Sequence, residues 1–274
     1  MWHLLLALNL FSWAYIPEYS LITSEMADIH GRGAYQIVQD VTIKKEAESF
    51  TVRETWTVLN ESTMVLKLDG RGPLRGLIDG TILFDEGRRV FYDGSAIRTQ
   101  KLGDEWIEPL FHFRSSKYFR NRMVSLKVAP PESLKERPSL AIEGEPNYQP
   151  PSFIRLARTG GAIAWAVGRN PKEGDSPTAW IEQDQFVIRK FKIPGQFTMK
   201  ADDYKKVDTA FLYPQTRYYN FGPYVVQVRT ARVQSLGRVS GSDDRFKKAT
   251  LSKNKDILKL PELAGLSDFY QRFR

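Results

Sequence analysis

The residues of this chain that are able to carry acid–base chemistry are few and scattered. Glu182 and Asp184 lie two positions apart, a spacing that would place both carboxylates on one side of a strand for glycoside hydrolysis or cation binding. They fall in a predicted hairpin turn, where a solvated loop is the simpler interpretation. His30 ends a predicted helix and His112 lies between two phenylalanines, and histidines outside a motif are more often structural. These residues therefore predict no catalytic centre.

Sequence motifs of nucleotide-binding and hydrolytic enzymes are also absent. There is no Walker-type GxxxxGK[ST], no GxGxxG after a strand, no GxSxG and no HExxH. The chain has 0 cysteines, which excludes a disulfide framework, a thiol nucleophile, cysteine-ligated zinc and a lipid-modified cysteine. We predict that the protein is not an enzyme and that it uses no metal and no cofactor.

The formal net charge of +8 would attract anionic partners, such as lipid headgroups, acidic polymers or nucleic acid. Taken alone, a positive charge of this size is more simply interpreted as an aid to solubility. Nucleic-acid binding requires basic and aromatic side chains on one face of the protein. The best candidates are Arg217, Tyr218, Tyr219, Tyr224 and Arg229, but the alternation of any antiparallel strand produces such a set. We therefore predict no nucleic-acid partner.

The N-terminal segment indicates export. Residues Trp2 to Ala14 carry no charge apart from a possible one on His3, and Ser12 and Ala14 occupy the −3 and −1 positions of a signal-peptidase site. The apolar stretch is too short for a permanent membrane-spanning helix, although the segment has no Lys or Arg before it. We predict a signal peptide cleaved after Ala14 and a periplasmic protein. The alternative is a buried N-terminal strand or helix.

Hydrophobic periodicity predicts a short helix at Ser20–His30, followed from Ala34 by an alternation with period two. A second helix is predicted within Trp106–Val128, behind Ser115-Ser116 as a cap. The expected strands are 35–43, 50–58, 64–68, 80–85, 88–92, 152–157, 162–167, two short strands or one bent strand within 179–193, 196–200, 216–221 and 224–233. This pattern predicts a β-dominated α+β fold: a curled antiparallel half-barrel sheet of roughly ten strands with a few covering helices.

The composition divides the chain into three parts: a signal peptide (1–14), a half-barrel domain (15–237) and a basic, partly helical C-terminal tail (238–274). Near the end of the tail, Leu263, Leu266, Tyr270 and Phe273 lie on one helical face. This face either covers an apolar groove, or binds a membrane or partner, or belongs to a frayed terminus.

Three segments resemble the Lol-type (LolA/LolB-like) outer-membrane lipoprotein carriers. They are Gly33–Asp40 (GAYQIVQD), Phe50–Val58 (FTVRETWTV) and Pro177–Pro194 (PTAWIEQDQFVIRKFKIP). The resemblance covers roughly 20–234 and contains no diagnostic motif. It implies an open half-barrel whose apolar concave face is closed by helices and receives an acylated lipoprotein or lipid. The tail beyond Gly237 is longer than such a carrier needs.

The resemblance also implies which apolar side chains line the concave face: Val52, Trp56, Val58, Leu66, Leu68, Ile163, Trp165, Phe186, Ile188, Val226 and Val228. The sequence thus predicts an exported carrier that binds an acyl chain or lipid, with an acylated lipoprotein or lipid as partner and an anionic membrane surface contacted through the tail. The alternative is an envelope interaction or membrane-docking module with a filled core and no ligand.

Overall fold

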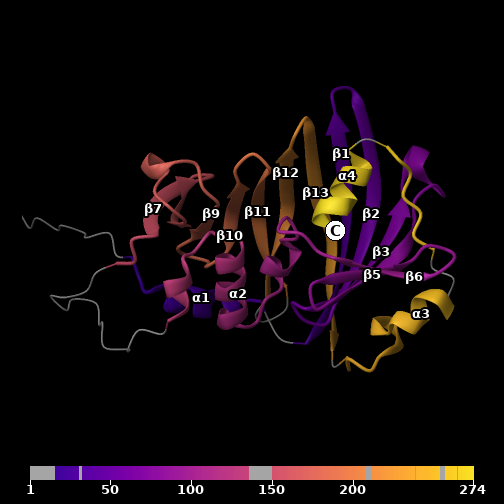
Figure 1. Ribbon diagram of the computed structural model, residues 1–274, viewed down its shortest axis with the longest axis horizontal. Coiled ribbons are helices and arrows are strands. Elements are labelled where there is room, and N and C mark those ends of the chain that lie inside the picture. Colours follow the sequence, from indigo (N-terminus) through magenta and orange to yellow (C-terminus); the bar gives the residue numbers. More distant parts are fainter. Residues whose placement is uncertain are drawn as a thin grey trace, which may run out of the picture.

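The computed structural model describes residues 16–30, 33–135, 150–207, 211–237, 239–253, 257–263 and 265–274. The signal peptide predicted over residues 1–14 lies outside these residues. The described strands form one open antiparallel sheet of 13 strands, which curls around a layer of helices (Figure 1). The predicted half-barrel class is confirmed. None of the described helices combines the length and apolarity needed to cross a lipid bilayer.

The sheet has the strand order β6-β5-β4-β3-β2-β1-β13-β12-β11-β10-β9-β8-β7, so the first and last strands of the domain meet in its centre. The strands are β1 Ala34–Lys45, β2 Glu48–Val58, β3 Thr63–Gly70, β4 Asp79–Asp85, β5 Arg88–Tyr92, β6 Ile97–Lys101, β7 Ile154–Thr159, β8 Ala162–Val167, β9 Thr178–Glu182, β10 Ile188–Ile193, β11 Phe197–Val207, β12 Phe211–Phe221 and β13 Tyr224–Gly237.

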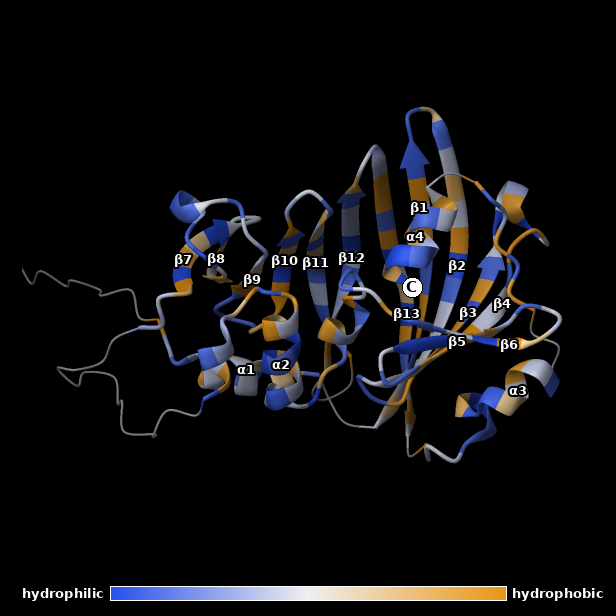
Figure 2. Cartoon of the chain, in the orientation of Figure 1, coloured by the Kyte–Doolittle hydropathy of each residue, from blue (hydrophilic) through white to orange (hydrophobic). Residues whose placement is uncertain are grey.

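Alternation of side chains gives the sheet an inner and an outer face, visible as bands along β1 and β2 in Figure 2. On the inner face Trp56 lies opposite Ile37 of β1 and Leu66 of β3, and all three are fully buried. On the outer face, three positions before Trp56 in β2, Arg53 forms an ion pair with Asp40 at 2.8 Å. The register therefore sends apolar side chains to one side and charges to the other.

Helices α1 (Tyr19–Asp28) and α2 (Ser116–Ser125), the short 3-10 helix η2 (Glu108–Phe111) and α4 (Leu266–Phe273) share one buried apolar cluster with the inner face. The predicted cap of α2 is confirmed, because the Ser115 hydroxyl accepts a hydrogen bond from the Tyr118 backbone N–H at 3.2 Å. Such a bond satisfies one of the N–H groups left free at the start of a helix. These helices close the inner face as the sequence predicts.

The C-terminal segment passes from the outer face of the sheet to the inner face. Helix α3 (Lys248–Lys253) lies on the outer face, where Phe246 and Leu251 cover the side chains of β3, β4 and β5. Residues 257–259 then bond to the strand ends, with the Leu258 N–H donating to Tyr92 O and the Lys259 N–H to Asp79 O, both at 2.8 Å. The segment ends as α4 on the inner face (Figure 1). We call residues 257–263 the strap.

The number of strands is larger than the roughly ten that were predicted. Strand β6 was missed because all five of its side chains are exposed at the sheet edge, so it shows no apolar alternation. The strand predicted at 196–200 continues to Val207, and Asp202 and Asp203 lie within it. Asp203 adopts a positive φ of 55°, an irregularity that breaks the pattern a regular strand would show.

Gly80 provides a test of the contact between the strap and β4. Its φ is +129°, and a Cβ there would lie 2.6 Å from the Leu258 Cα and 2.8 Å from the Ile257 carbonyl oxygen. We expect Gly80→Ala to lower the free energy of unfolding by about 2–4 kcal/mol, because the strap backbone must move.

The matched control for this substitution is Gly87→Ala. Gly87 has a φ of +76° but open space where a Cβ would stand, so only the backbone strain of about 1 kcal/mol is expected. Urea unfolding of the two variants measures the difference. Equal losses would show that the strap does not press on β4.

Candidate ligand-binding site

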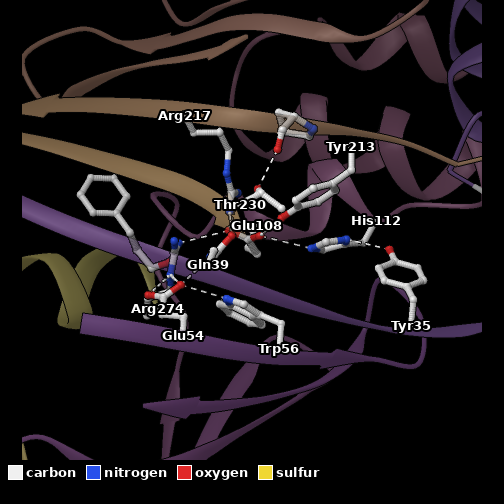
Figure 3. A network of polar contacts seen from close by, with 12 residues as sticks. Tyr35, Gln39, Glu54, Trp56, Glu108, His112, Tyr213, Arg217, Thr230 and Arg274 are labelled. Atoms are coloured by element: carbon white, nitrogen blue, oxygen red, sulfur yellow. Dashed lines mark hydrogen bonds and ion pairs between the residues drawn. The ribbon is translucent and has the colours of Figure 1, made fainter. Parts of the chain in front are cut away.

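A buried network of charged and polar side chains lies on the inner face, among the apolar residues (Figure 3). Strands β1, β2 and β12 contribute Gln39, Glu54 and Arg217, while η2 contributes Glu108 and the end of α4 contributes Arg274. Each of these side chains is no more than 1% exposed. Buried charges are rarely tolerated unless they are paired, so the arrangement of these groups is informative.

Glu108 is the central acceptor of the network. Its Oε2 atom accepts from Arg217 Nη1 at 2.8 Å and lies 3.1 Å from Arg274 Nη1. Burial alone would raise the pKa of the Glu108 carboxyl, but Arg217 and Arg274 outweigh burial and hold that pKa well below its usual value. Glu108 is therefore ionised and ties η2 to two other elements.

Glu54 is the second carboxylate and joins β2 to α4. Its oxygens accept hydrogen bonds from Arg274 Nε at 2.9 Å, from Trp56 Nε1 at 2.9 Å and from Gln39 Nε2 at 2.6 Å. The Gln39 carbonyl in turn accepts from Arg217 Nη2 at 2.8 Å. Two carboxylates thus face two guanidinium groups, and the charges of the network balance.

His112 extends the network toward β1. Its Nε2 lies 3.2 Å from Glu108 Oε1, and its Nδ1 lies 2.7 Å from the Tyr35 hydroxyl. Because an ionised carboxylate only accepts, Nε2 carries the proton and the Tyr35 hydroxyl donates to Nδ1. Burial lowers the pKa of His112, so the ring is neutral. The histidine is a satisfied structural group, as the sequence predicts.

A cavity of about 890 Å³ opens beside this core, between the β3–β6 end of the sheet and α2. Its lining includes the buried side chains of Met64, Phe84 and Trp106. The rings of Phe84 and Trp106 stack at 4.3 Å, and Trp56 lies behind them at 5.4 Å from Phe84. The volume lies within the range of about 300–1,000 Å³ that is typical of small-molecule sites.

Basic side chains also line this cavity, at its more exposed side. Arg88 and Lys101 are exposed, and Arg122 is half-buried. The Arg122 Nη2 atom donates to the Trp106 carbonyl at 2.9 Å, which fixes the guanidinium beside the cavity. Glu61 and Glu86 contribute two carboxylates to the same lining. The cavity therefore combines an apolar wall with a charged mouth.

The structure places most of the predicted lining residues in the core of the inner face. Nine of them are buried members of the main apolar cluster: Val52, Trp56, Val58, Leu66, Leu68, Trp165, Ile188, Val226 and Val228. Phe186 is half-buried and packs against this cluster. None of the eleven lines the 890 Å³ cavity. Their contact with a ligand stays a prediction.

Ile163 departs from the expected burial. It has the same side-chain direction along β8 as Trp165, but it lies beside the hairpin turn at the sheet edge and is 49% exposed. Ile163 accordingly belongs to neither of the two apolar clusters.

The carboxylate pair considered for chemistry is not brought together. Glu182 is buried and forms an ion pair with Arg189, whereas Asp184 is exposed in the turn. Within the described residues, no group of three or more His, Asp or Glu side chains is arranged to hold a metal ion.

Sequence reasoning missed the buried network, although its strand residues carry a signal. Glu54 lies midway between Val52 and Trp56 in β2, so alternation places its side chain on the same face as theirs. In the same way, Gln39 lies midway between Ile37 and Val41 in β1. A polar residue at a core-facing position is unusual enough to mark a candidate site. The partners from η2 and α4 lie far away in the sequence, so the pairing itself required the structure.

Comparison with known proteins identifies the architecture. No protein-family model matches the sequence, and no curated protein has a significantly similar sequence. Among solved structures, one similar fold is a domain described as an outer membrane lipoprotein-sorting protein from Vibrio parahaemolyticus, with a TM-score of 0.53, 13% identity and coverage of 85% of this chain and 97% of that chain. Another is a LolA superfamily protein from Nitrosomonas europaea, with a TM-score of 0.53, 9% identity and coverage of 85% and 99%. The chain therefore has a Lol-type fold.

Proposed function

We propose that this chain, whose fold is Lol-type, is a non-enzymatic protein of the cell envelope that binds an acyl chain or lipid on the inner face of its sheet. The main support for this proposal is the cavity on the inner side of the half-barrel, which is lined by Met64, Phe84 and Trp106. Two structures with the same fold are described as a lipoprotein-sorting domain and a LolA superfamily protein, which supports this direction.

The mechanism is sequestration. Each methylene of an acyl chain that leaves water gains about 0.8 kcal/mol, so an apolar wall offsets the cost of leaving a membrane. The aromatic stack of Trp106, Phe84 and Trp56 offers such a wall and leads from the cavity toward the predicted lining. A chain longer than the cavity would have to enter the core beneath the covering helices, which must then move.

The mouth of the cavity suits an anionic headgroup. Arg88, Lys101 and Arg122 supply three cations against the two carboxylates of Glu61 and Glu86. An acylated lipoprotein or an anionic lipid would place its chain against the rings and its headgroup beside these basic side chains. The predicted signal peptide, cleaved after Ala14, would bring the protein to the periplasm where such ligands occur.

Binding of a fluorescent fatty-acyl probe tests the proposal, with Gly103→Trp as the blocking variant. Gly103 lines the cavity, its φ is not positive, and a Cβ there would have no neighbour within 4 Å. We expect the tryptophan to fill the opening and to weaken probe binding about tenfold or more, a loss of at least about 1.4 kcal/mol.

Gly241→Trp is the matched control, because Gly241 lies in the outer-face segment and has room for a side chain beside Leu59. It should leave probe affinity unchanged. Native mass spectrometry of protein recovered from its envelope, with extraction of bound lipid, identifies the natural ligand. A ligand-free mass, together with no binding of the probe, would reject the proposal.

The alternative function, membrane docking through the tail, has less support. The apolar side chains of α4 that would enter a membrane are buried on the inner face: Leu266, Phe269, Tyr270 and Phe273. Those of the α3 region are buried against the outer face. Binding to anionic vesicles, measured for the full chain, tests this alternative independently of acyl binding.

A further inference from the structure

Helix α4 packs against the inner face of the sheet, in a position that an apolar ligand could also occupy. The rings of Phe269 and Phe273 meet Tyr219 of β12 at 5.7 and 5.3 Å, and Phe273 also meets Phe197 of β11 at 5.0 Å. Both phenylalanines are completely buried. The helix therefore fills a groove whose walls belong to the central strands, and its apolar side chains occupy the space that an apolar ligand would need.

The cation of this segment has a dedicated pocket. The Arg274 side chain is 0% exposed and bonds Glu54 at 2.9 Å, with Glu108 at 3.1 Å. Its guanidinium carbon lies 5.4 Å from the centre of the Trp56 ring and 5.9 Å from that of Tyr219. Two carboxylates and two aromatic rings around one cation are a recognised way to hold a quaternary or guanidinium group.

The charges left behind define what can replace α4. Without Arg274, the carboxylates of Glu54 and Glu108 face only the guanidinium of Arg217, because His112 is neutral. The groove then carries one uncompensated negative charge in a desolvated site. Removing one partner of a buried pair is strongly unfavourable, so any replacement occupant has to bring a cation.

Helix α4 is held by these contacts rather than by its own stability. It has eight residues, which is too short for a stable isolated helix. Arg89 of β5 donates to the carbonyls of Tyr270 and Arg274, both at 3.0 Å, and Gly265 starts the helix with a φ of +84° against Tyr224. A ligand that takes over the groove would therefore release the whole helix.

We propose that the groove beneath α4 is a ligand site for a cationic amphiphile, an apolar chain that ends in an ammonium or guanidinium group, and that α4 is its resident occupant. The chain of the ligand takes the place of Phe269 and Phe273, and its head takes the place of the Arg274 guanidinium between Glu54 and Trp56. This proposal rests on the proposed lipid binding and adds a second site to it. The second site prefers a cationic head, whereas the cavity beside Arg88 and Lys101 suits an anionic one.

Three probes of equal chain length test the site: dodecylammonium, dodecanol and dodecanoate, each below its critical micelle concentration. Because the chain has 0 cysteines, Gln271→Cys and Gln185→Cys allow specific spin labelling at two exposed positions, on α4 and on the β9–β10 turn. We expect dodecylammonium to shift the distance between the two labels, and to do so at a concentration at least about tenfold lower than either other probe. Circular dichroism confirms that the sheet stays folded.

Two results would overturn the inference. One is displacement of α4 by dodecanoate or dodecanol as readily as by dodecylammonium, which would mean that the groove is indifferent to charge. The other is binding of dodecylammonium with no change in label distance, which would place its site elsewhere. Neither result affects the proposed function, since that depends on acyl-probe binding blocked by Gly103→Trp with α4 in place.

Chemical rescue of Arg274→Ala gives a second test on the full chain. Butylguanidinium at low millimolar concentration is expected to raise the melting temperature of this variant by several degrees, since it restores the missing cation, whereas the neutral butyramide is not. The control is Arg245→Ala, which removes an exposed arginine paired with Asp243 on the outer-face segment. Equal stabilisation of both variants would contradict the proposed pocket, and if Arg274→Ala does not fold, the label experiment decides.

Discussion

Glu108→Gln is expected to lower the free energy of unfolding by about 3–5 kcal/mol, the usual cost of breaking a buried ion pair from one side. The substitution preserves the shape of the side chain and removes its charge. Arg274 keeps its ion pair with Glu54, whereas Arg217 loses its carboxylate partner and remains as a buried guanidinium without a counter-charge. Because α4 and η2 are both held through Glu108, we expect the loss to be accompanied by increased hydrogen exchange in α4.

Asp40→Asn is the matched control for this prediction. The pair Asp40–Arg53 joins β1 to β2 on the outer face, and its side chains are 33% and 37% exposed. Exposed pairs contribute about 0–1 kcal/mol, so the control variant should stay within about 1 kcal/mol of the wild type. Urea unfolding compares the two losses, and a loss for Glu108→Gln no larger than that of the control would mean that the network does not hold the inner face together.

The second large effect is a loss of stability in acid caused by His30. Burial lowers the pKa of His30 from 6.5 to about 3, while its Nδ1 bonds the Met26 carbonyl at 2.6 Å. The folded state therefore binds the proton more weakly than the unfolded state. The stability that depends on neutral His30 is fully present above pH 6.5 and is lost as the pH falls toward 3, by about 1.4 kcal/mol per pH unit and about 5 kcal/mol in total.

Asparagine at position 30 separates this effect from the titration of other groups. The amide of His30→Asn replaces the Nδ1 donor to Met26 but does not titrate. The variant should lose the part of the pH dependence of unfolding free energy that is due to His30. His112, whose pKa is also lowered by burial, should still contribute to that pH dependence. Unfolding free energies between pH 7.5 and 4 measure both slopes. Identical pH dependence of wild type and variant would exclude His30 as the titrating group.

The strands were predictable where one face is apolar. The alternation of Phe50, Val52, Trp56 and Val58 predicts β2 and one apolar face, and in the structure Trp56 on that face lies opposite Ile37 and Leu66. The same logic fails at β6, whose side chains are all exposed. Alternation reports the burial of one face, so a strand that buries neither face leaves no signal.

The candidate site was predictable only in part. Apolar residues of the inner face follow from strand periodicity, and the helical face of Leu266, Tyr270 and Phe273 follows from spacing. The buried polar network between the sheet and α4 could not be predicted, because ion pairs such as Glu54–Arg274 connect residues that no local sequence pattern relates. The interpretation in which the tail covers an apolar groove agrees with the structure of α4.

The position of the C-terminal segment also has a consequence for the order in which the chain folds. Strand β1 needs β13 as its neighbour, and Glu54 needs Arg274, a contact that spans 220 residues. Ribosomes make the N-terminal half first, so β1, β2 and the Glu54 carboxylate are synthesised well before their partners, β13 and Arg274. With contacts this distant along the chain, folding is expected to be slow and to finish only after synthesis. The sheet and its buried network are therefore expected to form only after β13 and α4 have been made.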